Sequence, residues 1–82
     1  MTKDDINIGS KVYYARIIPN TEIYEVCELN IRTVEDNFFV GTDKHEKQAY
    51  LFSYNKLNKI IFADRNKALH VVKEAEQLNQ RK

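Results

Sequence analysis

The chain has 82 residues, of which 43% are hydrophobic and 30% charged, and its formal net charge is +1. These values fit one soluble globular domain over residues 1–82 and exclude a disordered chain. A charge so close to zero supplies neither the basic excess typical of small nucleic-acid binders nor the acidic excess of a nucleic-acid mimic.

Cysteine content and hydropathy point to a location. Cys27 is the only cysteine, so no internal disulfide can form and a reducing compartment is expected. The first seven residues lack the apolar run of a secretory signal, and no segment reaches membrane-spanning length. We therefore expect a cytoplasmic protein with no membrane association.

The first two predicted strands cover residues 11–18 and 23–34 and are joined by a turn that contains Pro19. Both segments alternate apolar and polar residues and are rich in β-branched and aromatic side chains, as half-buried strands are. The second is about twice as long as a usual strand. A strand of this length in so small a domain is expected to bend.

The phase of the long strand predicts where it bends. Tyr24 and Val26 share one face of the strand, whereas Leu29 and Ile31 share the other. A β-bulge inserts one residue and reverses the phase. We therefore predict a bulge near Glu28 that brings both apolar pairs into a single core.

Three shorter strands are predicted at residues 38–42, 49–53 and 59–62. The polar turn at 35–37 predicts an antiparallel hairpin between the second and third strands. The charged segment 43–48 connects the third strand to the fourth, and a turn at 54–58 leads to the last.

A helix is predicted from about residue 64 to residue 80. Asp64 is a suitable N-cap because its carboxylate can accept hydrogen bonds from free amides of the first turn. The apolar residues that follow fall on one helical face, which is expected to pack on the sheet: Ala68, Leu69, Val71, Val72, Ala75 and Leu78. The elements together predict a mainly β, α+β fold, a five-stranded SH3-like barrel capped by one amphipathic α-helix.

Two segments resemble a known group of proteins. Residues 9–14 read Gly-Ser-Lys-Val-Tyr-Tyr, and residues 59–69 read Lys-Ile-Ile-Phe-Ala-Asp-Arg-Asn-Lys-Ala-Leu. They are similar to small uncharacterised SH3-like β-barrel proteins of phages and prophages of low-GC Gram-positive bacteria. Those begin with Gly-x-x-Val-Tyr and end with Val-Phe-x-[ST]-x-x-x-Ala entering a helix; Asp64 here replaces the usual Ser or Thr. The resemblance implies an SH3-like fold and a phage origin, and it carries over no catalytic residue.

The sequence offers little catalytic or metal-binding chemistry. His45 and His70 are far apart, and neither has a cysteine or carboxylate at metal-ligand spacing. Cys27 could pair with His45 as a thiol nucleophile, but no activating pattern is present and a strand cysteine is usually buried. We therefore predict that Cys27 is a core residue, that there is no metal site or cofactor, and that the protein is not an enzyme.

The aromatic residues suggest a protein-binding surface. Five tyrosines and four phenylalanines exceed what so small a core can bury. The remainder, for which we select Tyr13, Phe39 and Tyr54, would form either an exposed apolar interface or additional packing under the helix.

A second set of residues suggests an alternative, contact with nucleic acid. Cations interleaved with aromatics suit phosphate contact and base stacking, although Asp43 and Glu46 dilute the set, which comprises Arg32, Lys44, His45, Lys47 and Tyr50. The sequence favours a non-enzymatic phage-type accessory protein that modulates or inhibits a host protein by protein–protein contact. Pairing of two copies through an exposed strand edge is one form of such contact. The alternative is a nucleic-acid-binding SH3-like barrel.

Overall fold

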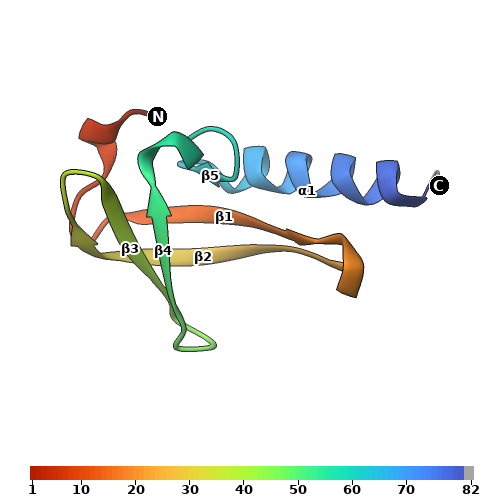
Figure 1. Ribbon diagram of the computed structural model, residues 1–82, viewed down its shortest axis with the longest axis horizontal. Helices are drawn as coiled ribbons and strands as arrows, with labels where there is room; N and C mark the ends of the chain where they lie inside the picture. The colour runs from red at the N-terminus through yellow and green to blue at the C-terminus, as the bar shows by residue number, and fades with distance from the viewer. Residues whose placement is uncertain (81–82) are drawn as a thin grey trace.

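The computed structural model describes residues 1–80 as one antiparallel sheet and one helix (Figure 1). The strands are β1 (Lys11–Ile18), β2 (Ile23–Val34), β3 (Phe38–Asp43), β4 (Ala49–Ser53) and β5 (Ile61–Phe62), and the helix is α1 (Arg65–Gln80). Three single 3₁₀ turns lie at η1 (Lys3–Asp5), η2 (Pro19–Thr21) and η3 (Tyr54–Lys56). The predicted fold class, mainly β with a C-terminal helix, is confirmed.

The sheet has the strand order β4-β3-β2-β1-β5 and curls into a half-barrel. Tyr14 on β1 and Tyr50 on β4 show the curl, because their ring centroids are 5.4 Å apart. In a flat sheet, three strand spacings would separate β1 from β4 by about 14 Å. Gly41 on β3 permits close packing at this curve, since a Cβ atom there would lie 3.1 Å from the Cβ of Leu29.

Two apolar clusters lie on opposite faces of β1 and β2. The concave face of the sheet encloses the larger cluster, formed by Ile6, Val12, Cys27, Leu29, Ile31, Phe39, Phe52 and Ile61. The convex face of β1 and β2 carries the smaller one, which joins the sheet to the helix and is formed by Ala15, Phe62, Ala68 and Val72. Strand β2 therefore has apolar contacts on both faces: Cys27, Leu29 and Ile31 are buried on the concave side, and Tyr24 and Val26 are half-buried on the convex side.

The predicted bulge near Glu28 was wrong. The β1–β2 pairing is continuous from Lys11↔Asn30 to Ile18↔Ile23, and the register instead shifts between Ile31 and Thr33, where β2 pairs with β3. No reversal of phase is needed, because Tyr24 and Val26 pack toward the helix while Leu29 and Ile31 enter the concave core. The helix covers the second face of the sheet, so the apolar residues on that face have a core of their own.

Helix α1 lies along β1, β2 and β5, and its last turn extends past the tip of the β1–β2 hairpin (Figure 1). Asp64 acts as the predicted cap, since its Oδ1 accepts a hydrogen bond from the backbone N–H of Asn66 at 2.9 Å. Ala68 and Val72 are buried, but Leu69 is only half-buried and Leu78 is 62% exposed. The predicted apolar face is therefore narrower than expected: it is centred on Ala68 and Val72, and Leu69 and Leu78 lie to either side of that line.

The end of the sheet also differs from expectation. The predicted strand 59–62 is reduced to Ile61–Phe62, because the N–H groups of Lys59 and Ile60 both bond back to the carbonyl of Lys56 in a turn. Within residues 1–80, no helix is long and apolar enough to cross a membrane.

Candidate protein-binding surface

The three aromatic residues predicted to form an interface do not make one. Phe39 is fully buried, and the expectation that it is exposed was wrong. Tyr54 is half-buried, with its ring centroid 5.4 Å from that of Phe39 and its hydroxyl donating to the carbonyl of Glu35 at 2.6 Å. Tyr13 is half-buried and packs on the cluster beneath the helix, as the alternative reading proposed. The alternation of side chains along β3 explains why Phe39 is buried. Phe39 points to the concave face, and its neighbour Phe38 points to the opposite face.

The cations of segment 43–48 lie in the tight turn between β3 and β4. Lys44, His45 and Lys47 are exposed there. The turn is held by Asp43, which is only 6% exposed and whose Oδ1 accepts hydrogen bonds from the N–H groups of His45 at 2.8 Å and Glu46 at 3.2 Å. Asp43 is therefore a structural residue of the turn.

The other two members of the nucleic-acid set lie elsewhere. Arg32 is exposed at the register shift of β2, where its neighbour Ile31 pairs with Gly41, about 10 Å along β3 from Lys44 at the usual rise. Tyr50 turns its ring inward against Tyr14, and its hydroxyl donates to Oε1 of Gln48 at 2.7 Å. The structure thus gathers Lys44, His45 and Lys47 in one turn but does not join Arg32 or the ring of Tyr50 to them as a single exposed patch.

Cys27 is a core residue, as predicted. It is 6% exposed in the concave cluster. Burial, reinforced by the nearby carboxylates of Glu25 and Asp43, raises the pKa of the thiol to about 11. The sulfur therefore stays protonated at neutral pH, whereas attack on an electrophile requires the thiolate.

An ion pair lies beside Cys27 that the sequence did not reveal. Arg16 Nη1 and Glu25 Oε1 are 2.8 Å apart on directly paired positions of β1 and β2. The hydrogen bond to Glu25 raises the pKa of Arg16. Arg16 and Glu25 are nine residues apart in the sequence, so an ion pair between them can be predicted only once the register of the β1–β2 hairpin is known.

The histidines remain apart. His45 lies in the β3–β4 turn, and Nε2 of His70 lies 2.9 Å from Oε1 of Glu74 one turn along α1. In the stretch from residue 1 to residue 80, no three His, Cys, Asp or Glu side chains lie close enough together to hold a metal ion.

Strand β4 has a free edge. The N–H of Asp43 donates to the carbonyl of Gln48 at 2.8 Å, so Gln48 is a residue whose backbone bonds to the β3 side. In antiparallel pairs every second residue bonds to the neighbour. Tyr50 and Phe52 therefore bond to β3, while Ala49, Leu51 and Ser53 turn their N–H and C=O groups to the open side. Over the described part of the chain, no turn or loop backbone bonds to Ala49 or Leu51 on that side.

The free edge adjoins an uncovered apolar face. Leu51 is 64% exposed, and its partner Val40 and the nearby Phe38 are half-buried on the same side of the sheet. Helix α1 covers this side over β1, β2 and β5 only, and β3 and β4 lie beyond it (Figure 1). We call the free edge of β4, together with Leu51, Val40 and Phe38, the β4 surface. Unpaired backbone groups beside exposed apolar side chains can accept another strand.

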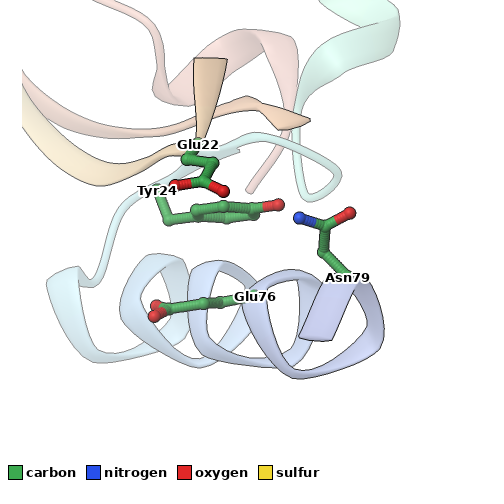
Figure 2. Close-up of a pocket in the computed structure, with 4 residues that line it drawn as sticks. All are labelled: Glu22, Tyr24, Glu76 and Asn79. Carbon is green, nitrogen blue, oxygen red and sulfur yellow. The ribbon is translucent and has the colours of Figure 1, made fainter. Parts of the chain in front are cut away.

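A hollow of about 180 Å³ separates the tip of the β1–β2 hairpin from the end of α1, lined by Glu22, Tyr24, Glu76 and Asn79. Figure 2 shows the ring of Tyr24 between the two glutamates, with its hydroxyl directed toward Asn79. That hydroxyl is buried and has no hydrogen-bond partner. It is a packing imperfection at the helix–hairpin contact, because a buried hydroxyl without a partner lowers stability.

Comparison of the chain with protein-family models, with curated proteins and with solved structures found no match.

Proposed function

We propose that this protein is a non-enzymatic binding module that acts by protein–protein contact through the β4 surface. The observation that carries the proposal is the unpaired edge of β4 beside Leu51, which is 64% exposed. Natural proteins usually protect such edges with charges, prolines or bulges. Residues 49–53, Ala-Tyr-Leu-Phe-Ser, contain neither a charge nor a proline, so the edge is left open to a partner.

Two further observations support this function over the others considered. Cys27 and His45, the one nucleophile–base pair that the sequence suggested, lie in the core and in an exposed turn respectively. The cations of the nucleic-acid alternative are divided between the β3–β4 turn and the β2 register shift. The resemblance to phage proteins supports an accessory role in which the partner is a host protein that is modulated or inhibited.

The proposal is tested by capturing partners from a lysate of a low-GC Gram-positive bacterium. Leu51→Lys places a charge on the β4 surface, and Leu78→Lys makes the same change on α1 at a leucine of nearly equal exposure. We expect the original protein and Leu78→Lys to retain the same host protein in high salt, and Leu51→Lys to lose it. Retention by all three would place the binding surface elsewhere, and retention only in low salt would favour a charge-dominated partner such as nucleic acid.

A further inference from the structure

We propose that the occupant of the β4 surface is an extended segment of the partner protein with apolar residues in its centre and acidic residues at both ends. This inference rests on the function proposed above and specifies the chemistry of the partner. It follows from the hydrogen-bonding pattern of the edge, the apolar side chain at its centre and the charges at its two ends.

The hydrogen-bonding pattern requires an extended backbone. Ala49, Leu51 and Ser53 present donors and acceptors at alternate residues of β4, and a strand is the one regular structure that matches this spacing. A strand laid on this edge directs alternate side chains to the convex face, where Leu51 and Val40 offer apolar contact. The centre of the bound segment should therefore be apolar and β-branched.

The charges at the ends of the edge select acidic flanks. Lys47 lies in the turn that precedes β4, and Lys56 ends η3, which follows β4 directly. Both side chains are exposed, and in the described residues neither forms a salt bridge. Lys44 adds a second cation at the first end and Glu46 offsets one of them. A strand bound in either direction therefore meets a lysine at each end.

The same charges disfavour a second copy of this chain. In an antiparallel β4–β4 pair centred on Leu51, position 47 of one copy faces position 55 of the other, which places Lys47 beside the partner's Lys56. Like charges in this relation repel, whereas a segment with acidic ends pairs with both lysines. Pairing of two copies through β4 is thus the alternative to the proposed partner segment, and the test below distinguishes the two.

The test uses a synthetic peptide with blocked ends, Asp-Glu-Val-Thr-Val-Thr-Val-Glu-Asp, and a counterpart in which all four acids are lysine. Binding is followed by NMR titration of the isotope-labelled protein. We expect shifts centred on the amides of Ala49, Leu51 and Ser53, and affinity about tenfold higher for the acidic peptide at low salt, with the difference shrinking as salt rises. Lys47→Glu combined with Lys56→Glu should reverse the preference.

Variants at Leu51 separate the backbone from the side chain. Leu51→Pro removes one outward N–H without breaking the β3–β4 ladder, because proline is tolerated where an edge N–H faces solvent, and it should abolish binding while preserving the circular dichroism spectrum. Leu51→Ala keeps the N–H and should bind with reduced affinity. Leu78→Ala, a matched exposed leucine on α1, should bind normally.

Three results would overturn the inference: equal affinity for both peptides, shifts that avoid β4, or formation of a dimer that displaces the peptide at high protein concentration. The host-capture experiment reports on the function separately. Loss of the captured partner in Leu51→Lys, together with no preference for acidic flanks, would leave the protein-binding function standing and remove only this partner chemistry.

Discussion

Tyr14 on β1 and Phe52 on β4 are in edge-to-face contact, with ring centroids 4.9 Å apart and ring planes at 68°, although β2 and β3 separate their strands in the sheet. Their contact closes the half-barrel across its concave face. Phe52 also packs on Phe39, so the rings form a continuous row from β1 to β3. The curl of the sheet therefore brings these rings together, and their contacts in turn hold the sheet curled.

The Tyr14–Phe52 contact should be measurable as a coupling free energy. Each residue is changed to Leu singly and together, and the free energy of unfolding is measured with urea. We expect the two losses to be non-additive by about 0.5–1.5 kcal/mol, the usual contribution of an aromatic pair beyond its burial. The pair Phe52 and Val72, which lie in different clusters, is the control and should be additive within about 0.5 kcal/mol. Additivity of the first pair would mean that the rings do not hold the curl.

The helix should contribute stability through Val72 and not through its outer leucine. Val72 is 3% exposed, and Val72→Ala should reduce the free energy of unfolding by about 2 kcal/mol through lost burial and an unfilled cavity. Leu78 is 62% exposed, and Leu78→Ala should change it by less than about 0.5 kcal/mol. Leu69→Ala should fall between the two, because Leu69 is half-buried. Equal urea midpoints for all three variants would mean that α1 is only loosely attached.

Burial of Cys27 should make the fold sensitive to alkaline pH. Its thiol has a pKa of about 11 in the folded protein against 9.0 for an ordinary cysteine. Between these values the unfolded chain loses the proton and the folded chain retains it, so stability falls as pH rises. We expect a loss of up to about 2 kcal/mol across this window.

Cys27→Ala isolates the thiol contribution. The variant loses the thiol and should lack this part of the decline. Burial, the largest cause of the raised pKa values of Tyr14 and Tyr50, acts in both proteins, and only the smaller part of each shift that comes from the charge of Cys27 is lost with the thiol. Urea titrations of the two proteins at pH 8, 9, 10 and 11 provide the comparison. A constant difference between them over the whole range would show that the thiol ionises as readily in the folded state as in the unfolded one.

The unpaired hydroxyl of Tyr24 should be dispensable. Tyr24→Phe removes a buried oxygen that has no hydrogen-bond partner and keeps the ring between the hairpin and α1. We expect the melting temperature to stay unchanged or to rise, because the desolvation cost of the hydroxyl disappears. Tyr13→Phe is the comparison, since the Tyr13 hydroxyl contacts Oε1 of Glu28 at 3.4 Å. A clear loss of stability confined to Tyr24→Phe would show that the hydroxyl has a partner in solution.

The cations of the β3–β4 turn should not confer useful affinity for nucleic acid. With a net charge of +1, and with Glu46 between Lys44 and Lys47 in the sequence, counterion release is small. We expect fluorescence anisotropy to detect no binding of a mixed-sequence oligonucleotide tighter than about 10⁻⁵ M at physiological salt. Submicromolar affinity that collapses as salt rises, and that is lost when both lysines are changed to Glu, would establish the nucleic-acid alternative.

The sequence predicted the elements well because their signals are local. The period-two pattern of residues 23–34 and the Asp64 cap each identify structure without knowledge of the rest of the chain. To predict which side of the sheet each residue faces, one must also know whether the protein has one apolar core or two. One assumed core required a bulge near Glu28, whereas the two observed clusters require none.

The candidate site was harder to predict for the same reason. The aromatic content predicted that leftover rings would be exposed, but rings such as Phe39 fill the concave face, and the exposed apolar residue beside the free edge is an aliphatic one, Leu51. The free edge of β4 follows from the strand order, in which β5 pairs with β1 and not with β4. No local pattern in residues 49–53 encodes that choice.

That strand order also has a consequence for how the chain folds. Strands β1 to β4 each pair with the next in sequence, so the meander can assemble from turns a few residues long. Pairing of β5 with β1 instead joins Phe62 to Tyr13 across almost the whole sheet and must close a long loop. We infer that docking of β5 and α1 onto a preformed meander is the slow step, and that changes at Phe62 slow refolding while changes at Leu51 leave its rate unaltered.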